Sequence, residues 1–164
     1  MVLIEPVTLG NLALFKETCL RALSDTPSAF GSTYARESQF TDEESRNRVL
    51  RWNGEKGIGI LALDNGATCG IAGCFLDSDT LSRAQLISMW TAPSHRHLGI
   101  GRRLVEEVAA WARNRGATNL LLLVTSTNEP AKRFYERLGF LRTGRTEPYP
   151  NDPALVEYEM ARPL

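Results

Sequence analysis

The stretch "LISMWTAPSHRHLGIGRRLVEEVAAWARNRG", residues 86–116, contains a strand pattern, a glycine-containing bend and a helix pattern in direct succession. Pro93 ends the predicted strand, because proline has no N–H to donate to a neighbouring strand. From Gly101 to Arg115 the apolar residues recur at helical spacing, and Gly116 ends the predicted helix. The bend R-x-x-G-x-G, residues 96–101, therefore leads directly into a helix N-terminus.

This bend is suited to holding an anion. The first turn of a helix leaves N–H groups unpaired, and the helix dipole favours negative charge there. Gly99 and Gly101 carry no side chain that would keep a phosphate from the backbone, and basic residues flank them: Arg96, His97, Arg102 and Arg103. A pyrophosphate fits this arrangement. The alternative is a tight turn that needs two glycines for its geometry and leaves the arginines in solvent.

Two familiar phosphate motifs do not fit the bend. A P-loop requires G-x-x-x-x-G-K-[ST], and no lysine lies here. A dinucleotide-binding fingerprint requires a third glycine and an acidic residue after the next strand, and neither is present.

A second segment, "TSTNEPAKRFYERLGF" at residues 125–140, follows a continuous apolar strand pattern. Asn128 lies at the strand–helix junction, where its amide either caps the helix or contacts a ligand. Tyr135 shares a helical face with Ala131 and Leu138 and is expected to point inward. Its phenol is either a packed aromatic or a functional group.

The rest of the chain predicts an α/β fold. The elements follow the order strand, two helices, three strands, helix, strand, helix, two strands, which indicates a mixed sheet, antiparallel early and parallel in the middle. No repeat or linker-like stretch interrupts residues 1–164, so we expect one domain. The remaining predicted elements are strands at 2–8, 57–66, 68–78, 140–147 and 154–162, helices at 11–25 and 41–54, and a hairpin turn at 64–67.

Composition excludes several classes of function. The chain is 43% apolar and 23% charged, which is typical of a soluble globular protein. Its 19 basic and 19 acidic residues balance, so we expect no general attraction to nucleic acid or to a membrane. We find no signal peptide and no apolar run long enough to span a membrane. Three cysteines without a CxxC motif indicate inert structural thiols and a cytoplasmic location.

Together, the two segments resemble the GNAT family of N-acetyltransferases. Residues 86–116 are similar to that family's acetyl-CoA motif, with R-x-x-G-x-G complete. "NEPAKRFYERLGF" is similar to its second motif, N-x-x-A-x-x-x-Y-x-x-x-G-F. The resemblance implies a partly parallel, seven-stranded sheet flanked by about four helices. It also implies a splayed central strand pair that holds acetyl-CoA in the gap.

The family pattern assigns cofactor contacts residue by residue. The pantetheine amides would pair with a strand edge at Met89, Trp90 and Thr91, as in strand addition. Asn128, Ala131 and Phe134 would lie along the pantetheine arm. The pyrophosphate would take the bend, which comprises Arg96, His97, Leu98, Gly99, Ile100, Gly101 and Arg102.

The implied chemistry is direct attack of an amine on the thioester in a ternary complex. A strand N–H near Trp90 or Thr91 would stabilise the developing oxyanion. Tyr135 matches the position of the family's general acid and would protonate the leaving thiolate. No metal is implied, and His95 and His97 have no apparent third ligand. We expect Trp90 to pack in the sheet rather than to stack on the adenine.

The general base and the acceptor are less defined. Some family members carry a glutamate where this chain has Leu123, and the preceding strand offers only Gln85 and Ser88. A water chain, Glu37, Tyr34 or a late-loop residue could serve as the base. The acceptor, a small-molecule amine or an amine of a peptide or protein, is expected beside two loops that carry Phe30, Ser32, Tyr34, Glu37, Glu147, Tyr149 and Asp152.

One rival reading is a catalytically silent module that binds or senses acetyl-CoA. Tyr135 argues for catalysis, and the missing glutamate argues against it. A nucleic-acid-binding domain is disfavoured by the zero net charge. The resemblance to the family implies a homodimer, and no interface can be identified in the sequence itself.

Overall fold

The computed structural model describes all residues 1–164 and contains one seven-stranded sheet of order β1-β2-β3-β4-β5-β7-β6. All neighbouring strands are antiparallel except the parallel pair β4 and β5. The strands are β1 (Val2–Pro6), β2 (Gly57–Asp64), β3 (Ala67–Leu76), β4 (Arg83–Thr91), β5 (Asn119–Thr125), β6 (Leu141–Pro148) and β7 (Val156–Pro163). The predicted mixed sheet is confirmed. The insertion of β7 between β5 and β6 was not predicted.

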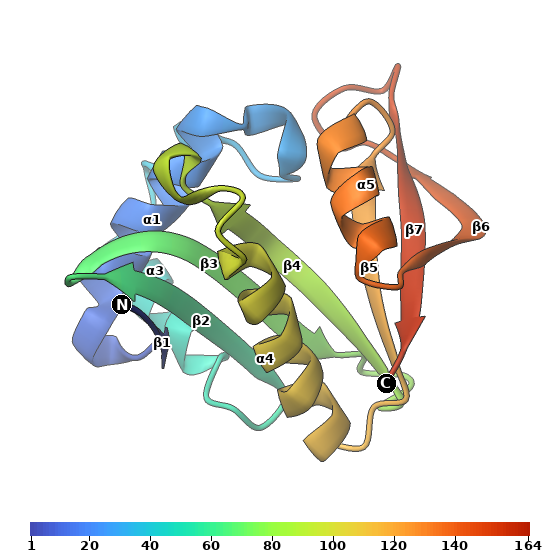
Figure 1. Ribbon diagram of the computed structural model, residues 1–164. Coiled ribbons are helices and arrows are strands. Elements are labelled where there is room, and N and C mark those ends of the chain that lie inside the picture. The colour runs from blue at the N-terminus through green and yellow to red at the C-terminus, as the bar shows by residue number, and fades with distance from the viewer.

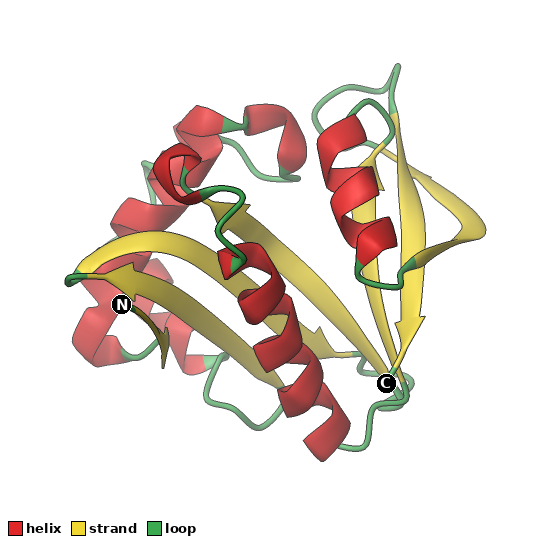
Figure 2. Cartoon of the chain, viewed as in Figure 1, coloured by secondary structure: helices red, strands yellow, loops and turns green.

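Helices cover both faces of this sheet (Figure 1, Figure 2). In Figure 1, α1 and α3 lie behind the sheet, and α4 and α5 lie in front of it. None of the helices has the length and apolar character needed to cross a membrane. The helices are α1 (Leu12–Asp25), α2 (Tyr34–Glu37), α3 (Asp42–Leu50), α4 (Ile100–Asn114) and α5 (Glu129–Arg137), with short 3-10 turns η1 (Leu9–Asn11), η2 (Pro27–Ala29) and η3 (Pro93–His95).

Local sequence signals explain several of these elements. The predicted hairpin turn joins β2 to β3 and places Asn65 and Gly66 at φ 51° and 82°, the positive values that a two-residue hairpin turn requires. In α3, Thr41 and Glu44 form a reciprocal capping box.

The core lies between the sheet and the helices. The predicted apolar face of α4 is buried, with Leu104, Val105, Val108 and Ala112 almost inaccessible to solvent. All three cysteines are free and buried. Burial raises the pKa of the Cys19 and Cys74 thiols to about 12, which agrees with a structural role for both.

On the opposite face, Trp52 lies flat on two glycines. A Cβ placed at Gly59 would be 2.0 Å from Trp52 Cε3, and one at Gly73 would be 2.8 Å from Trp52 Cζ2. The indole also meets Phe15 edge to face, at a centroid distance of 5.5 Å. The absence of side chains at these two glycines therefore makes room for the Trp52 ring on the sheet.

The parallel pairing of β4 with β5 covers only three residue pairs, from Arg83–Asn119 to Gln85–Leu121. Beyond these pairs the two strands diverge (Figure 1). The edge of β4 from Leu86 to Thr91 therefore has β3 on one side and no strand on the other.

We predict that Gly59→Ala lowers the free energy of unfolding by about 1–3 kcal/mol, because the new methyl overlaps the Trp52 ring and displaces it from the sheet. Chemical denaturation monitored by tryptophan fluorescence measures the change. Gly31→Ala is the matched control, since its Cβ would meet only Pro150 Cγ at 3.8 Å. Equal stability of the two variants would contradict the packing argument.

Candidate active site

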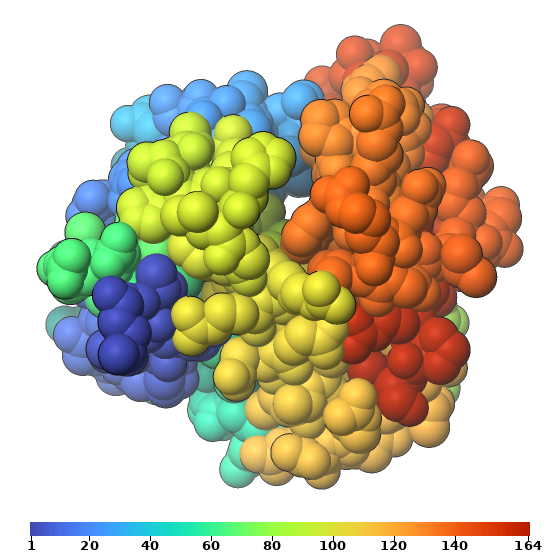
Figure 3. All heavy atoms as spheres, in the orientation of Figure 1, coloured from blue at the N-terminus to red at the C-terminus, as the bar shows by residue number.

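The divergence of β4 and β5 produces an opening in the molecule. In Figure 3 it lies between the yellow-green segment that leads into α4, the orange helix α5 and the blue segment around η2 and α2. Because β4 is unpaired along this side, its backbone N–H and C=O groups line one wall of the opening. An extended amide-containing chain could pair with this edge as an added strand does.

A bulge in β4 sets the direction of the side chains along that wall. Ser88 has φ 56°, and the register with β3 shifts between Ile71 and Gly73. The additional residue reverses the alternation of faces. Met89 consequently points toward α4 and α5, where it lies beside Gly101, and Trp90 points toward α1.

At the far end of β4, the glycine bend presents unpaired backbone donors. His97 and Gly99 adopt left-handed conformations, with φ 64° and 82°. The six consecutive N–H groups from His97 to Arg102 donate no hydrogen bond within the chain. The dipole of the 15-residue helix α4 adds positive potential at the same point. This combination suits a phosphate or pyrophosphate group.

The side chains around the bend mostly anchor it to the protein. Arg96 donates from Nε to the Thr91 carbonyl at 3.0 Å and from its guanidinium to Asp25 of α1. His95 Nε2 lies 2.8 Å from Asp64 Oδ2, and this hydrogen bond lowers the pKa of the Asp64 carboxyl. Of the predicted anion-binding side chains, those of His97 and Arg102 are exposed and have no protein partner.

Asp25 also accepts a hydrogen bond from Trp90 Nε1 at 3.0 Å. Trp90 is 5% exposed and carries Arg21 over its ring, so it packs between the sheet and α1, as predicted. Burial opposes ionisation of Asp25, but hydrogen bonds from Trp90 and Arg96 outweigh it and lower the pKa of the carboxyl. Asp25 thereby joins α1 to β4 and to the start of the bend.

The opposite wall comes from α5. Asn128 Oδ1 accepts a hydrogen bond from Ala131 N at 3.3 Å, so the amide caps the helix, while its Nδ2 donates no bond within the chain. Phe134 reaches across the gap to α4, since a Cβ at Gly101 would be 3.0 Å from Phe134 Cζ and 3.4 Å from Met89 Cε. Three predicted cofactor residues therefore meet at one point.

Tyr135 is 8% exposed and packs edge to face against Phe134 and Phe140, at centroid distances of 5.2 and 5.6 Å. Its hydroxyl makes no hydrogen bond within the chain. Every fully buried polar side-chain atom has a partner, so the hydroxyl must reach solvent. Burial raises the pKa of the phenol, which therefore stays protonated at neutral pH.

The predicted acceptor residues occupy different settings. Tyr149 is 4% exposed, and its hydroxyl donates to the carbonyl of Phe30 at 2.8 Å. Tyr34 is exposed on α2. Glu37 pairs with Arg48 at 2.6 Å in an open cavity of about 880 Å³ between α2 and α3, whose lining contains none of the predicted cofactor residues.

Several contacts at the site were missed by sequence reasoning. Asp25 lies 65 residues from Trp90, and nothing in its local pattern marked it. Asn151 donates to the carbonyl of Phe30, and Thr125 Oγ1 donates to the carbonyl of Ser28. These bonds fix the segment Pro27–Phe30, here called the strap, to the C-terminal half of the sheet.

The chain matches the model of the acetyltransferase (GNAT) family over residues 21–140. That match covers most of the chain, including the bend and the whole Tyr135 motif from Asn128 to Phe140, and the chain therefore belongs to this family. The chain contains no group of three or more His, Cys, Asp or Glu side chains that could hold a metal ion.

Two curated relatives cover different parts of the chain. Streptothricin acetyltransferase of Streptomyces lavendulae is 51% identical over 53 residues, which are 32% of this chain and 28% of that protein. N-alpha-acetyltransferase 30 of Schizosaccharomyces pombe is 34% identical over 92 residues, 55% of this chain and 61% of that protein. The chain thus spans less than two thirds of either relative.

Solved structures agree on the fold. A GNAT-family acetyltransferase from Streptococcus pneumoniae aligns with a TM-score of 0.83 at 23% identity over 100% of this chain and 99% of that one. The PaiA N-acetyltransferase of Thermoplasma acidophilum, solved in complex with coenzyme A, aligns with a TM-score of 0.80 at 17% identity over the same shares.

We predict that Asp25→Asn lowers the free energy of unfolding by about 1.5 kcal/mol near neutral pH, because the charge-assisted bond to Arg96 is lost. The pKa of Asp25 is lower in the folded state, so its contribution is complete above the ordinary aspartate pKa of about 3.9 and disappears as the pH falls through the folded value. Wild type and variant should therefore converge in acid.

Denaturant titrations at a series of pH values test this. Asp79→Asn, in an exposed loop without an ion pair, is the control. A stability difference between wild type and Asp25→Asn that persists unchanged in acid would show that the Asp25 charge is not responsible.

Proposed function

We propose that the chain is an N-acetyltransferase that moves the acetyl group of acetyl-CoA to a primary amine by direct attack in a ternary complex. The observation that carries the proposal is the shape of the gap. It has an unpaired strand edge along one wall, six free N–H donors at one end and the Tyr135 phenol on the other wall. Membership of the GNAT family supports it.

In this proposal, the donors from His97 to Arg102 hold the pyrophosphate, and Arg96 and His95 support the bend from behind. The pantetheine amides pair with Met89, Trp90 and Thr91. Asn128 Nδ2, Ala131 and Phe134 line the arm from the α5 side. Gly101 lets Phe134 and Met89 approach the start of α4 closely, because a Cβ there would be 3.0 Å from Phe134 Cζ.

The reaction needs charge stabilisation on two atoms. As the amine attacks, a β4 N–H near Trp90 or Thr91 donates to the thioester oxygen. The sulfur then leaves as a thiolate, and Tyr135 donates the proton that it needs. The desolvation that raises the pKa of the phenol also raises the proton affinity of a thiolate beside it, so the transfer stays feasible.

The relatives named above carry acetyltransferase names that differ in acceptor: streptothricin in one name and an N-alpha position in the other. We propose an amine acceptor for this chain without choosing between a small molecule and a peptide or protein. The free thiols agree with the reducing cytoplasm as its location. Dimerisation stays a prediction.

Thermal unfolding with acetyl-CoA tests the binding part of the proposal. Ligand at 100 times its dissociation constant should add about 2.7 kcal/mol, or about 5–10 °C for a chain of this size, with acetyl-CoA and CoA but not with NAD. Gly101→Val should abolish the shift, because its side chain would collide with the Phe134 ring and displace it into the gap. If acetyl-CoA gives wild type no shift, the proposed cofactor is wrong.

Tyr135→Phe tests the chemical part. Loss of a general acid should lower kcat by about 100-fold and leave the thermal shift with acetyl-CoA in place. Thiol release with a panel of primary amines measures kcat. Tyr158→Phe is the control, because it removes a hydroxyl from the same side of the sheet. An unchanged rate in Tyr135→Phe would remove Tyr135 as the acid, and absence of turnover in wild type would favour a silent binding module.

A further inference from the structure

The sheet face that is turned away from α4 and α5 is partly open where β4 and β5 diverge. Residues that point toward α4 and α5, such as Leu86, Leu122 and Val124, are at most 4% exposed. On the other face, Leu121 and Thr125 are buried, but four residues of β4, β5 and β7 are partly exposed: Gln85, Ile87, Leu123 and Glu157. An acceptor arriving from this side reaches the gap without displacing the core.

Glu157 lies one strand beyond the gap, beside the open end of β5. Thr125, the last residue of β5, pairs with Glu157 of β7, which pairs in turn with Glu147 of β6. Side chains at directly paired positions share one face, with Cβ atoms about 5 Å apart. Thr125 Oγ1 donates to the carbonyl of Ser28 at 2.8 Å, so this row of side chains lies beside the strap.

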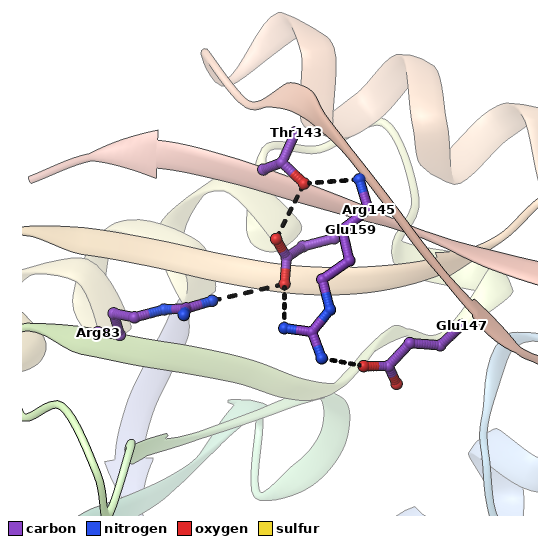
Figure 4. A network of polar contacts seen from close by, with 5 residues as sticks. All are labelled: Arg83, Thr143, Arg145, Glu147 and Glu159. Carbon is purple, nitrogen blue, oxygen red and sulfur yellow. Dashed lines mark hydrogen bonds and ion pairs between the residues drawn. The ribbon is translucent and has the colours of Figure 1, made fainter.

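The other carboxylates of this face are compensated by cations. Glu159 accepts a hydrogen bond from Thr143 at 2.9 Å and lies 3.6 Å from Arg83 and 3.9 Å from Arg145. Arg145 also donates to Glu147 at 3.0 Å, which places it between two acids (Figure 4). Glu157 has neither an ion pair nor a hydrogen bond to its carboxylate.

Arg83 and Arg145 therefore pair with the carboxylates of Glu159 and Glu147, and the carboxylate of Glu157 has no cationic partner. Partial burial, and after it the charge of Glu147, raise the pKa of Glu157. The charged groups that face this row are Glu147 and Arg145 on β6, Glu159 on β7 and Arg83 on β4. Neither β5 nor the strap turns a titratable side chain toward it. Glu157 is thus an unpaired carboxylate that binds a proton more readily than an ordinary glutamate.

We propose that Glu157 receives the ammonium group of the acceptor at the open end of the gap and removes its proton, which makes basic alkylamines the acceptor class. This inference rests on the proposed function. It supplies the base that the β4 and β5 strands lack, since none of their side chains on this face is a carboxylate; those beside the divergence are Gln85, Ile87, Leu123 and Thr125.

The protons and bonds balance as follows. Glu157 takes one proton from R–NH₃⁺, and the amine nitrogen then forms a bond to the thioester carbon. The C–S bond breaks with its electron pair on sulfur, and Tyr135 gives its proton to that thiolate. The new amide nitrogen loses its surplus proton, which restores the phenol, and Glu157 releases the first proton to solvent. The sum is amide, CoA thiol and one proton.

Glu157→Gln tests the proposal, because it keeps the size of the side chain and removes the base. The assay is thiol release from acetyl-CoA with butylamine, 1,4-diaminobutane and lysine amide over a range of pH. We expect kcat/KM for the amine to fall by about 100-fold at pH 7. The thermal shift with acetyl-CoA should not change.

The pH profile separates a base from a structural role. Without Glu157 only the neutral amine reacts, so log kcat/KM should rise with unit slope toward the amine pKa of about 10.4, and the deficit should shrink at high pH. A structural defect would lower the rate by the same factor at every pH. Glu55→Gln, in an exposed loop, is the control for the substitution itself.

Glu147→Gln provides a second, independent readout. Removal of the neighbouring negative charge, together with release of Arg145, should move the acidic limb of the kcat/KM profile to lower pH. If wild type acetylates amines but Glu157→Gln has the wild-type rate and profile, the role of Glu157 is wrong and the proposed acetyltransferase function still stands. If wild type binds acetyl-CoA and acetylates no amine, the proposed function fails together with the role of Glu157.

Discussion

Three residue pairs of parallel β-structure hold the two halves of this sheet together. The pairs from Arg83–Asn119 to Gln85–Leu121 align β4 with β5 at one end and then stop. Because the strands twist and separate beyond that point, the far end of the sheet needs another connection. The strap supplies it through bonds from Thr125, Tyr149 and Asn151 to its carbonyl groups. The gap is therefore a defined space, closed at its base by the sheet and bounded at its mouth by the strap.

Backbone conformation, more than side-chain charge, prepares the proposed cofactor wall. The bulge at Ser88 turns Met89 into the gap and Trp90 away from it, and left-handed residues at His97 and Gly99 free the N–H groups of the bend. The arginine and histidine that flank the bend act from behind, through Asp25 and Asp64. The chain's own backbone conformation would thus shape the proposed anion site, which lowers the entropy that binding must offset.

The two faces of the sheet divide the proposed chemistry. The face toward α4 and α5 carries the phenol of Tyr135 in an apolar setting formed by Phe134 and Phe140. The opposite face carries a polar network in which Arg83 and Arg145 neutralise two of three carboxylates. An acid that stays protonated and a carboxylate that is a strengthened base would then act on opposite sides of one thioester. This arrangement requires no residue to serve in both roles.

The sequence by itself determined the elements whose signals are local. The helix after the bend, the hairpin turn at Asn65–Gly66, the cap at Asn128 and the burial of Trp90 were all predictable, because spacing, turn chemistry and apolar periodicity act over a few residues. The mixed character of the sheet followed from the order of these elements. The resemblance of two motifs then indicated which residues to expect around the gap.

Only the tertiary structure decided which distant residues meet. Strand β7 inserts between β5 and β6, and this pairing alone brings Glu157 beside Thr125 across 32 residues of chain. The same holds for Asp25 with Trp90 and Arg96, and for the strap with Tyr149. The bulge at Ser88 depends on how β3 and β4 pack, not on a turn signal. Contacts of this kind are set by the register of strands and the packing of layers, and these depend on the whole chain at once.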